Sequence, residues 1–82
     1  MLKKLLKYTV IYTAEPEGGF TVTVPSLPGC VTYGKDLKEA ERKAKEAIGL
    51  YLESLKAHKE PIPQEGKSFI GSVDLNLPSV NA

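Results

Sequence analysis

The stretch that decides the fold is residues 18–40, which read GGFTVTVPSLPGCVTYGKDLKEA. Within it, Phe20, Val22 and Val24 alternate with threonines, and this period of two is typical of a strand with one buried face. The residues before the two glycines, 6–14, are rich in β-branched and aromatic side chains. Because two such segments surround a short glycine loop, residues 6–24 are predicted to form a β-hairpin whose Phe/Val face lies in the core.

A proline-rich connection separates this hairpin from a third strand. Pro25 ends the second strand because proline has no amide proton to donate to a ladder. Residues 25–29, Pro-Ser-Leu-Pro-Gly, are typical of a rigid turn. The four residues that follow, 30–33, are predicted to form a short third strand, which Gly34 ends.

A long amphipathic helix is predicted over residues 36–58. The Asp36 carboxylate is expected to accept a hydrogen bond from the Glu39 amide, while the Glu39 side chain reaches back to the Asp36 amide. Apolar side chains recur on one stripe, at spacings of three and four: Leu37, Ala40, Ala44, Ala47, Ile48, Tyr51, Leu52 and Leu55. Leu50 lies off this stripe, so it is either a simple exposed leucine or a contact with another subunit.

One more strand is predicted after the helix. Two prolines in residues 60–66 prevent helix continuation, and residues 68–77 alternate again. Phe69, Val73, Leu75 and Leu77 share one face, and Ile70, Ser72, Asp74 and Asn76 share the other. The prediction is therefore an α+β fold of order β-β-β-α-β in a single domain, residues 1–82. Its three- to four-stranded, mainly antiparallel sheet carries one long helix on one face.

Composition and charge argue against two classes of partner. With 11 basic and 10 acidic residues the net charge is +1, whereas a domain that holds nucleic acid through its phosphates has a strong basic excess. No run approaches the roughly 20 apolar residues that span a bilayer. Cys30 is the only cysteine, so no internal disulfide is possible. A cytoplasmic protein that binds neither DNA directly nor membranes is expected.

No set of residues with a catalytic pattern is found, so no catalytic residue, cofactor or metal site is predicted. Cys30 and His58 are the only residues of their kinds, and a zinc site needs about four ligands. A contact between them is left open, but a small buried thiol is the favoured interpretation of Cys30. Asp74 is the only acidic residue in a predicted strand, whereas two-metal phosphodiester hydrolysis needs clustered carboxylates.

The loop over residues 24–34 and the start of the helix carry a more specific signal. The pattern P-x-L-P-G-C-x-T-x-G, after a glycine hairpin and before a helix that begins L-x-E-A, resembles the N-terminal domain of the HicB-type antitoxins over residues 6–60. This resemblance implies a partial ribonuclease-H-like fold without the catalytic carboxylates. It also implies a partner, a small messenger-RNA-cleaving toxin of the HicA type whose active site the antitoxin blocks. The motif residues Gly19, Pro25, Pro28, Gly29, Cys30, Gly34, Ala40 and Ala44 are interpreted as structural.

Many members of that family continue into a DNA-binding domain, whereas this chain is expected to be a stand-alone form without one. Its alternative function is an orphan oligomeric binding module with no toxin partner. A homodimer or higher oligomer is expected, because so short a chain builds a thin core and one helix covers only one sheet face. The candidate residues for a protein interface are Tyr8, Tyr12, Leu27, Pro28, Tyr33 and Leu50.

Overall fold

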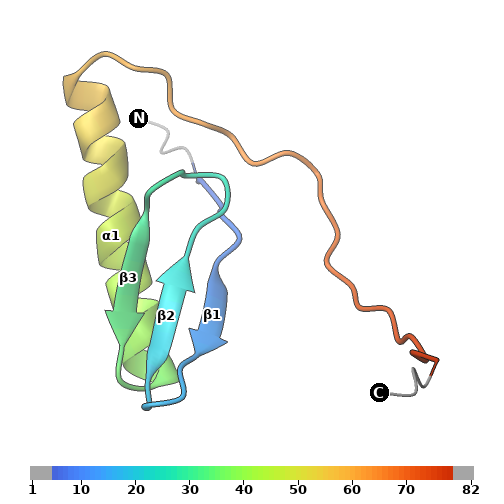
Figure 1. The fold of residues 1–82 in the computed structure, drawn as a ribbon. Helices are drawn as coiled ribbons and strands as arrows, with labels where there is room; N and C mark the ends of the chain where they lie inside the picture. Colours follow the sequence, from blue (N-terminus) through green and yellow to red (C-terminus); the bar gives the residue numbers. More distant parts are fainter. Residues whose placement is uncertain (1–4, 79–82) are drawn as a thin grey trace.

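Residues 5–78 are described by the computed structural model, and they form a three-stranded sheet with one helix against it (Figure 1). The strands are β1 (Ile11–Ala14), β2 (Phe20–Thr23) and β3 (Val31–Gly34), and the helix α1 spans Leu37–Ala57. The sheet order is β1-β2-β3, with both neighbouring pairs antiparallel. The α+β prediction is thus confirmed. The predicted hairpin and helix contain the observed elements, whereas β3 lies one residue later than the predicted third strand and includes Gly34.

The hairpin closes through a tight turn that two glycines make possible. The Gly18 amide donates to the Glu15 carbonyl at 2.9 Å, and the Glu15 amide donates to the Gly19 carbonyl at 3.0 Å. Gly18 and Gly19 have φ angles of +107° and +81°, in the region that favours glycine. The register places Tyr12 opposite Val22.

The connection between β2 and β3 folds inward. The Leu27 amide donates to the Val24 carbonyl, and the Cys30 amide donates to the Leu27 carbonyl, both at 2.9 Å. This double turn drops the Leu27 side chain into the core, where it is fully buried. The loop motif therefore has a structural role, because it buries Leu27 between the sheet and α1.

The helix begins at its predicted cap, with one difference in the hydrogen bonds. The Glu39 amide donates to Asp36 Oδ1 at 2.8 Å as expected. The Glu39 carboxylate, however, accepts from the Lys35 amide at 2.8 Å rather than from the Asp36 amide. The prediction of a reciprocal bond to Asp36 is wrong by one residue, although the cap itself is Asp36 with extended backbone, as expected.

The core consists of two small clusters between the sheet and α1. In one, Val22 packs against Ala40 and Ala44; in the other, Val24 and Leu27 pack with Cys30. The predicted Phe/Val core face of β2 is confirmed, with Phe20 partly buried at its edge. Gly34 lies so close to the helix that a Cβ there would sit 2.3 Å from the Ala40 amide nitrogen. The helix covers β3 and β2 and leaves β1 beside it uncovered (Figure 1).

The predicted fourth strand is not formed. Residues 68–77 are extended but have no strand partner within residues 5–78. Their apolar side chains are exposed: Phe69, Ile70, Val73, Leu75 and Leu77. The alternating pattern is present, but alternation marks only a segment suited to pairing, and this segment runs away from the sheet (Figure 1). Within residues 5–78, no helix has an apolar stretch long enough to cross a bilayer.

Candidate functional site

The aromatic residues singled out as interface candidates lie on different surfaces. Tyr12 faces the α1 side of the sheet, because its cross-strand partner Val22 is in the core. Tyr33 faces the opposite side, where its hydroxyl donates to the Gly18 carbonyl at 2.9 Å. Tyr8 is half-buried and its hydroxyl donates to the Pro63 carbonyl at 2.6 Å. These tyrosines therefore do not form one contact surface.

The three remaining candidates differ in accessibility. Leu27 is fully buried, so it belongs to the core and offers no surface to a partner. Pro28 is exposed at the tip of its loop, and its carbonyl accepts a hydrogen bond from the Tyr51 hydroxyl at 2.8 Å. Leu50 is exposed on α1, with 63% of its surface accessible.

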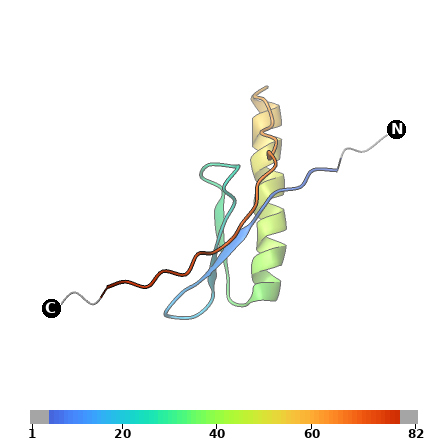
Figure 2. The same cartoon turned by 90° about the vertical axis from the view of Figure 1, so that its right-hand side faces the viewer.

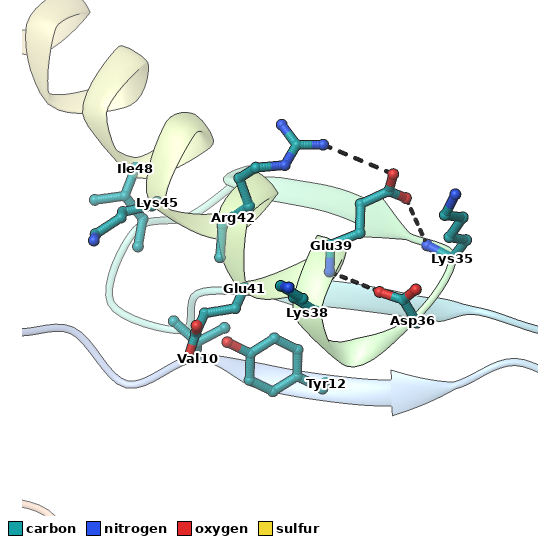
Figure 3. A pocket seen from close by; sticks show the side chains of 11 residues that line it. Val10, Tyr12, Lys35, Asp36, Lys38, Glu39, Glu41, Arg42, Lys45 and Ile48 are labelled. Atoms are coloured by element: carbon teal, nitrogen blue, oxygen red, sulfur yellow. Dashed lines mark hydrogen bonds and ion pairs between the residues drawn. The ribbon is translucent and has the colours of Figure 1, made fainter.

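An open groove with a volume of about 770 Å³ lies between α1 and the chain around β1 (Figure 3). Val10, just before β1, and Tyr12, on β1, form its floor and point toward the helix. Ala44 and Ile48 form the apolar part of its wall. The groove exists because α1 is centred on β3 and β2, so the helix side of β1 is left without a cover.

The rim of the groove is charged with both signs. Lys38, Glu41 and Lys45 follow one another on α1 at spacings of three and four, on the stripe that ends at Ile48. Arg42 also borders the groove and lies 3.7 Å from the Glu39 carboxylate (Figure 3). An apolar floor with a mixed polar rim is the arrangement of a protein-binding surface. The sequence contained a signal for it, since this stripe lies directly beside the apolar one.

A second open surface is the sheet face away from α1, called here the open face. The register aligns Ile11, Thr23 and Val31 in one row, and Thr13, Thr21 and Tyr33 in the next. None of these six side chains is charged. Ile11, Val31 and Tyr33 are 43%, 58% and 48% exposed.

The reactive side chains are not assembled for chemistry. Cys30 is buried in the core, and burial raises the pKa of its thiol, which keeps it protonated and unreactive. His58 ends the helix, where its Nδ1 donates to the Ser54 carbonyl at 2.7 Å. Among the described residues, no three of His, Cys, Asp and Glu gather as metal ligands would.

Glu65 anchors the segment after the helix to the start of the sheet. Its carboxylate accepts hydrogen bonds from the Thr9 hydroxyl and, at 2.6 Å, from the Thr9 amide. The Ser26 hydroxyl adds a third at 3.2 Å. The bonds from Thr9 favour the charged form and lower the pKa of Glu65. Sequence reasoning missed this contact because it joins residues 56 positions apart.

Comparison with known proteins gives a consistent result. A family model described as the HicB-like antitoxin of bacterial toxin-antitoxin systems matches residues 8–74. A UPF0150 protein of Thermoplasma acidophilum is 55% identical over 65 residues, which cover 79% of this chain and 94% of that protein. A UPF0150 protein of Synechocystis is 41% identical over 63 residues, which cover 77% of this chain and 80% of that protein. A UPF0150 protein of Helicobacter pylori is 41% identical over 61 residues, which cover 74% of this chain and 85% of that protein.

Proposed function

The chain belongs to the family of HicB-like antitoxins of bacterial toxin-antitoxin systems, and from that premise we propose that it binds a HicA-type toxin and blocks it. The toxin would be a small ribonuclease that cleaves messenger RNA. The family points to a role without catalysis, in which the protein acts by covering the active site of its partner. The observation that carries the proposal is the groove between α1 and β1, with its apolar floor and mixed charged rim.

The groove suits a protein partner more than a small ligand. It is open along its length, and its floor is formed by Tyr12 on β1, an edge strand of the sheet, and by Val10 just before that strand. Apolar side chains of a partner could pack on Val10 and Tyr12 while its charged groups meet Lys38, Glu41 and Lys45. Alternating charges on a rim serve mainly to select the partner and its orientation.

Inhibition of RNA cleavage tests the proposal directly. The full chain is added in increasing amounts to a purified HicA-type ribonuclease, and cleavage of a messenger RNA is followed on a gel. We expect cleavage to stop near a fixed stoichiometry of the two proteins. Cleavage that continues in the presence of excess chain would overturn the proposal that the chain inhibits this ribonuclease.

A charge-reversal pair tests the groove separately. Lys45→Glu changes the rim, whereas Lys56→Glu makes the same change elsewhere on α1, at an exposed position outside the groove. We expect Lys45→Glu to weaken inhibition about tenfold and Lys56→Glu to change it less than about twofold. If the two changes have equal effects while the unaltered chain still inhibits, the groove is not part of the interface. The proposed inhibition of the toxin would remain valid in that case.

The second candidate is an oligomeric binding module without a toxin. The exposed apolar side chains after residue 68 favour it, because large exposed apolar patches mark protein interfaces. Self-association as a homodimer or higher oligomer is proposed under either function. Recovery of a stoichiometric small ribonuclease with the tagged chain would decide for the antitoxin, and recovery of the chain alone would decide for the module.

A further inference from the structure

The feature that neither the groove nor the family explains is the extended segment of residues 66–77, called here the arm. It carries five large apolar side chains, each between 79% and 90% exposed: Phe69, Ile70, Val73, Leu75 and Leu77. With the arm extended, the chain has a radius of gyration of 17.0 Å and a longest extent of 63 Å. A compact domain of this length has a radius of gyration of about 12 Å. Such a length of exposed apolar chain needs a surface to cover it.

The chain's own sheet is too short to take the whole arm. Glu65 is held beside Thr9, which fixes where the arm begins. If the arm ran along β1 residue for residue from that point, Ile70 would lie opposite Ala14, where β1 ends. Val73, Leu75 and Leu77 would then extend beyond the sheet, so pairing within one chain cannot cover them.

The apolar row of the arm also points away from its own chain. Ser68 and Ile70 line a hollow of about 340 Å³ against Thr9 and Ile11. Successive side chains of an extended segment point to opposite sides. The row that contains Phe69, Val73, Leu75 and Leu77 is therefore directed outward, and Asp74 and Asn76 lie on the other side of the arm.

The open face of the sheet is a partly apolar surface. It presents Ile11, Val31 and Tyr33 among threonines. One carboxylate borders it, that of Glu15, which accepts a hydrogen bond from the Thr21 hydroxyl at 2.5 Å. Figure 2 shows the arm leaving the body on the side of the sheet that faces away from α1. Arm and open face are thus on the same side of the molecule, where a second copy facing the first would meet both.

We propose that the arm of each copy packs its apolar row across the open face of a second copy, in a symmetric dimer. Residues 71–77 span about 23 Å at about 3.3 Å per residue, which is enough to cross three strands spaced about 4.8 Å apart. Each copy has one arm and one open face, so a two-fold pair uses all four surfaces and closes. Reciprocal exchange covers Val73, Leu75 and Leu77 of each arm together with the open face of each copy.

Two matched pairs of variants test this dimer, with molar mass measured by light scattering and sedimentation equilibrium on the full chain. In the arm, Leu75→Asp places a charge in the apolar row, whereas Asn76→Asp adds the same charge on the other side. On the body, Val31→Asp places a charge on the open face, where Val31 is 58% exposed. Its control is Leu37→Asp, which places the same charge on α1, where Leu37 is 56% exposed. We expect Leu75→Asp and Val31→Asp to raise the dissociation constant at least tenfold, about 1.4 kcal/mol, and the two controls to change it little.

Mixing identifies the surfaces that meet. Leu75→Asp retains an intact open face and Val31→Asp retains an intact arm, so an equimolar mixture should recover part of the dimer that neither forms alone. A monomeric unaltered chain, as expected if the arm folds back on its own β1, would overturn the proposal. A dimer that survives Val31→Asp, as expected if arm pairs with arm, would overturn it as well. Circular dichroism verifies folding, and Val31→Lys replaces Val31→Asp if the latter does not fold.

Discussion

At the scale of single residues, Gly19 shows how the hairpin depends on the absence of a side chain. A Cβ at this position would lie 1.9 Å from the Tyr33 hydroxyl oxygen, whereas a Cβ at Gly18 would meet nothing within 4 Å. Both residues have positive φ, so alanine is strained at either position. Only at Gly19 must the Tyr33 ring also move and lose its hydrogen bond to the Gly18 carbonyl.

We therefore expect Gly19→Ala to lower the free energy of unfolding by about 2–3 kcal/mol and Gly18→Ala by about 1 kcal/mol. Urea unfolding followed by circular dichroism measures both. In the double variant Gly19→Ala/Tyr33→Phe, the hydroxyl that causes the nearest clash is absent. Gly19→Ala should therefore lower the free energy of unfolding less in the Tyr33→Phe background than in the unaltered chain. Equal losses for Gly18→Ala and Gly19→Ala would contradict the steric argument.

Glu65 gives the anchor of the arm a pH dependence. Its pKa in the folded chain is lowered from the ordinary 4.5 by the hydrogen bonds from Thr9. A lowered folded pKa contributes stability above the unfolded value, and this contribution is lost as the pH falls through the folded value. We expect the Thr9 amide to be protected from hydrogen exchange near neutral pH and to lose that protection on acidification below the ordinary range of glutamate.

The control is Glu65→Gln, which can still accept hydrogen bonds but does not titrate. In this variant the Thr9 amide should be less protected near neutral pH, and acidification should add no step of its own. An acid-induced step of the same size in Glu65→Gln would assign the pH dependence to another group.

At the scale of secondary-structure elements, the close approach of α1 to β3 depends on Gly34. A Cβ there would lie 2.3 Å from the Ala40 amide nitrogen, which is backbone and cannot turn aside. A Cβ at Gly49, within α1, would meet nothing within 4 Å. We expect Gly34→Ala to cost about 2–4 kcal/mol by forcing the helix away, and Gly49→Ala to gain about 0.5–1 kcal/mol from helix propensity.

Thermal and urea unfolding of the two alanine variants would check this pair. Opposite signs are the expected result, because the same substitution meets a packed backbone at one position and open space at the other. If Gly34→Ala is as stable as the unaltered chain, β3 and α1 can move apart without a loss in the free energy of unfolding.

The elements differ in how far the sequence could predict them. The hairpin, the short third strand and the helix follow from local signals: the Gly18-Gly19 turn, Pro25, and the Asp36 cap. The strand expected over 68–77 has an equally clear alternation, but a strand also needs a partner edge, and local pattern carries no information about that. The same limit hid the bond between Glu65 and Thr9, and it made Leu27 look like a contact residue although the loop turns it inward.

The binding surfaces were predictable only in part. Tyr12 and Tyr33 are both interface candidates by sequence, yet they lie on opposite sides of the sheet, which is apparent only from the register of the strands. The groove depends on where α1 lies over the sheet. A hydrophobic stripe indicates which side of a helix is buried, but it does not say which strand remains uncovered beside it.

At the scale of the whole molecule, the chain combines a small body with a long exposed arm. The fully buried large side chains are Leu27 and Val22, so the body is held by few contacts. If the arms exchange between two copies, part of the stability of the folded chain comes from association. The unfolding equilibrium then includes two chains on the unfolded side and one dimer on the folded side.

This equilibrium makes stability depend on protein concentration. For a dimer that unfolds to two chains, each tenfold increase in total concentration stabilises the folded state by about 1.4 kcal/mol, so the urea midpoint of the full chain should rise with concentration. Leu75→Asp should unfold at a lower midpoint, and this midpoint should stop changing with concentration in the range where the weakened dimer has dissociated. Asn76→Asp should behave as the unaltered chain does. A midpoint independent of concentration in the unaltered chain would show instead that the body is stable alone and that the arm contributes nothing to it, since dimerisation linked to folding always obeys mass action.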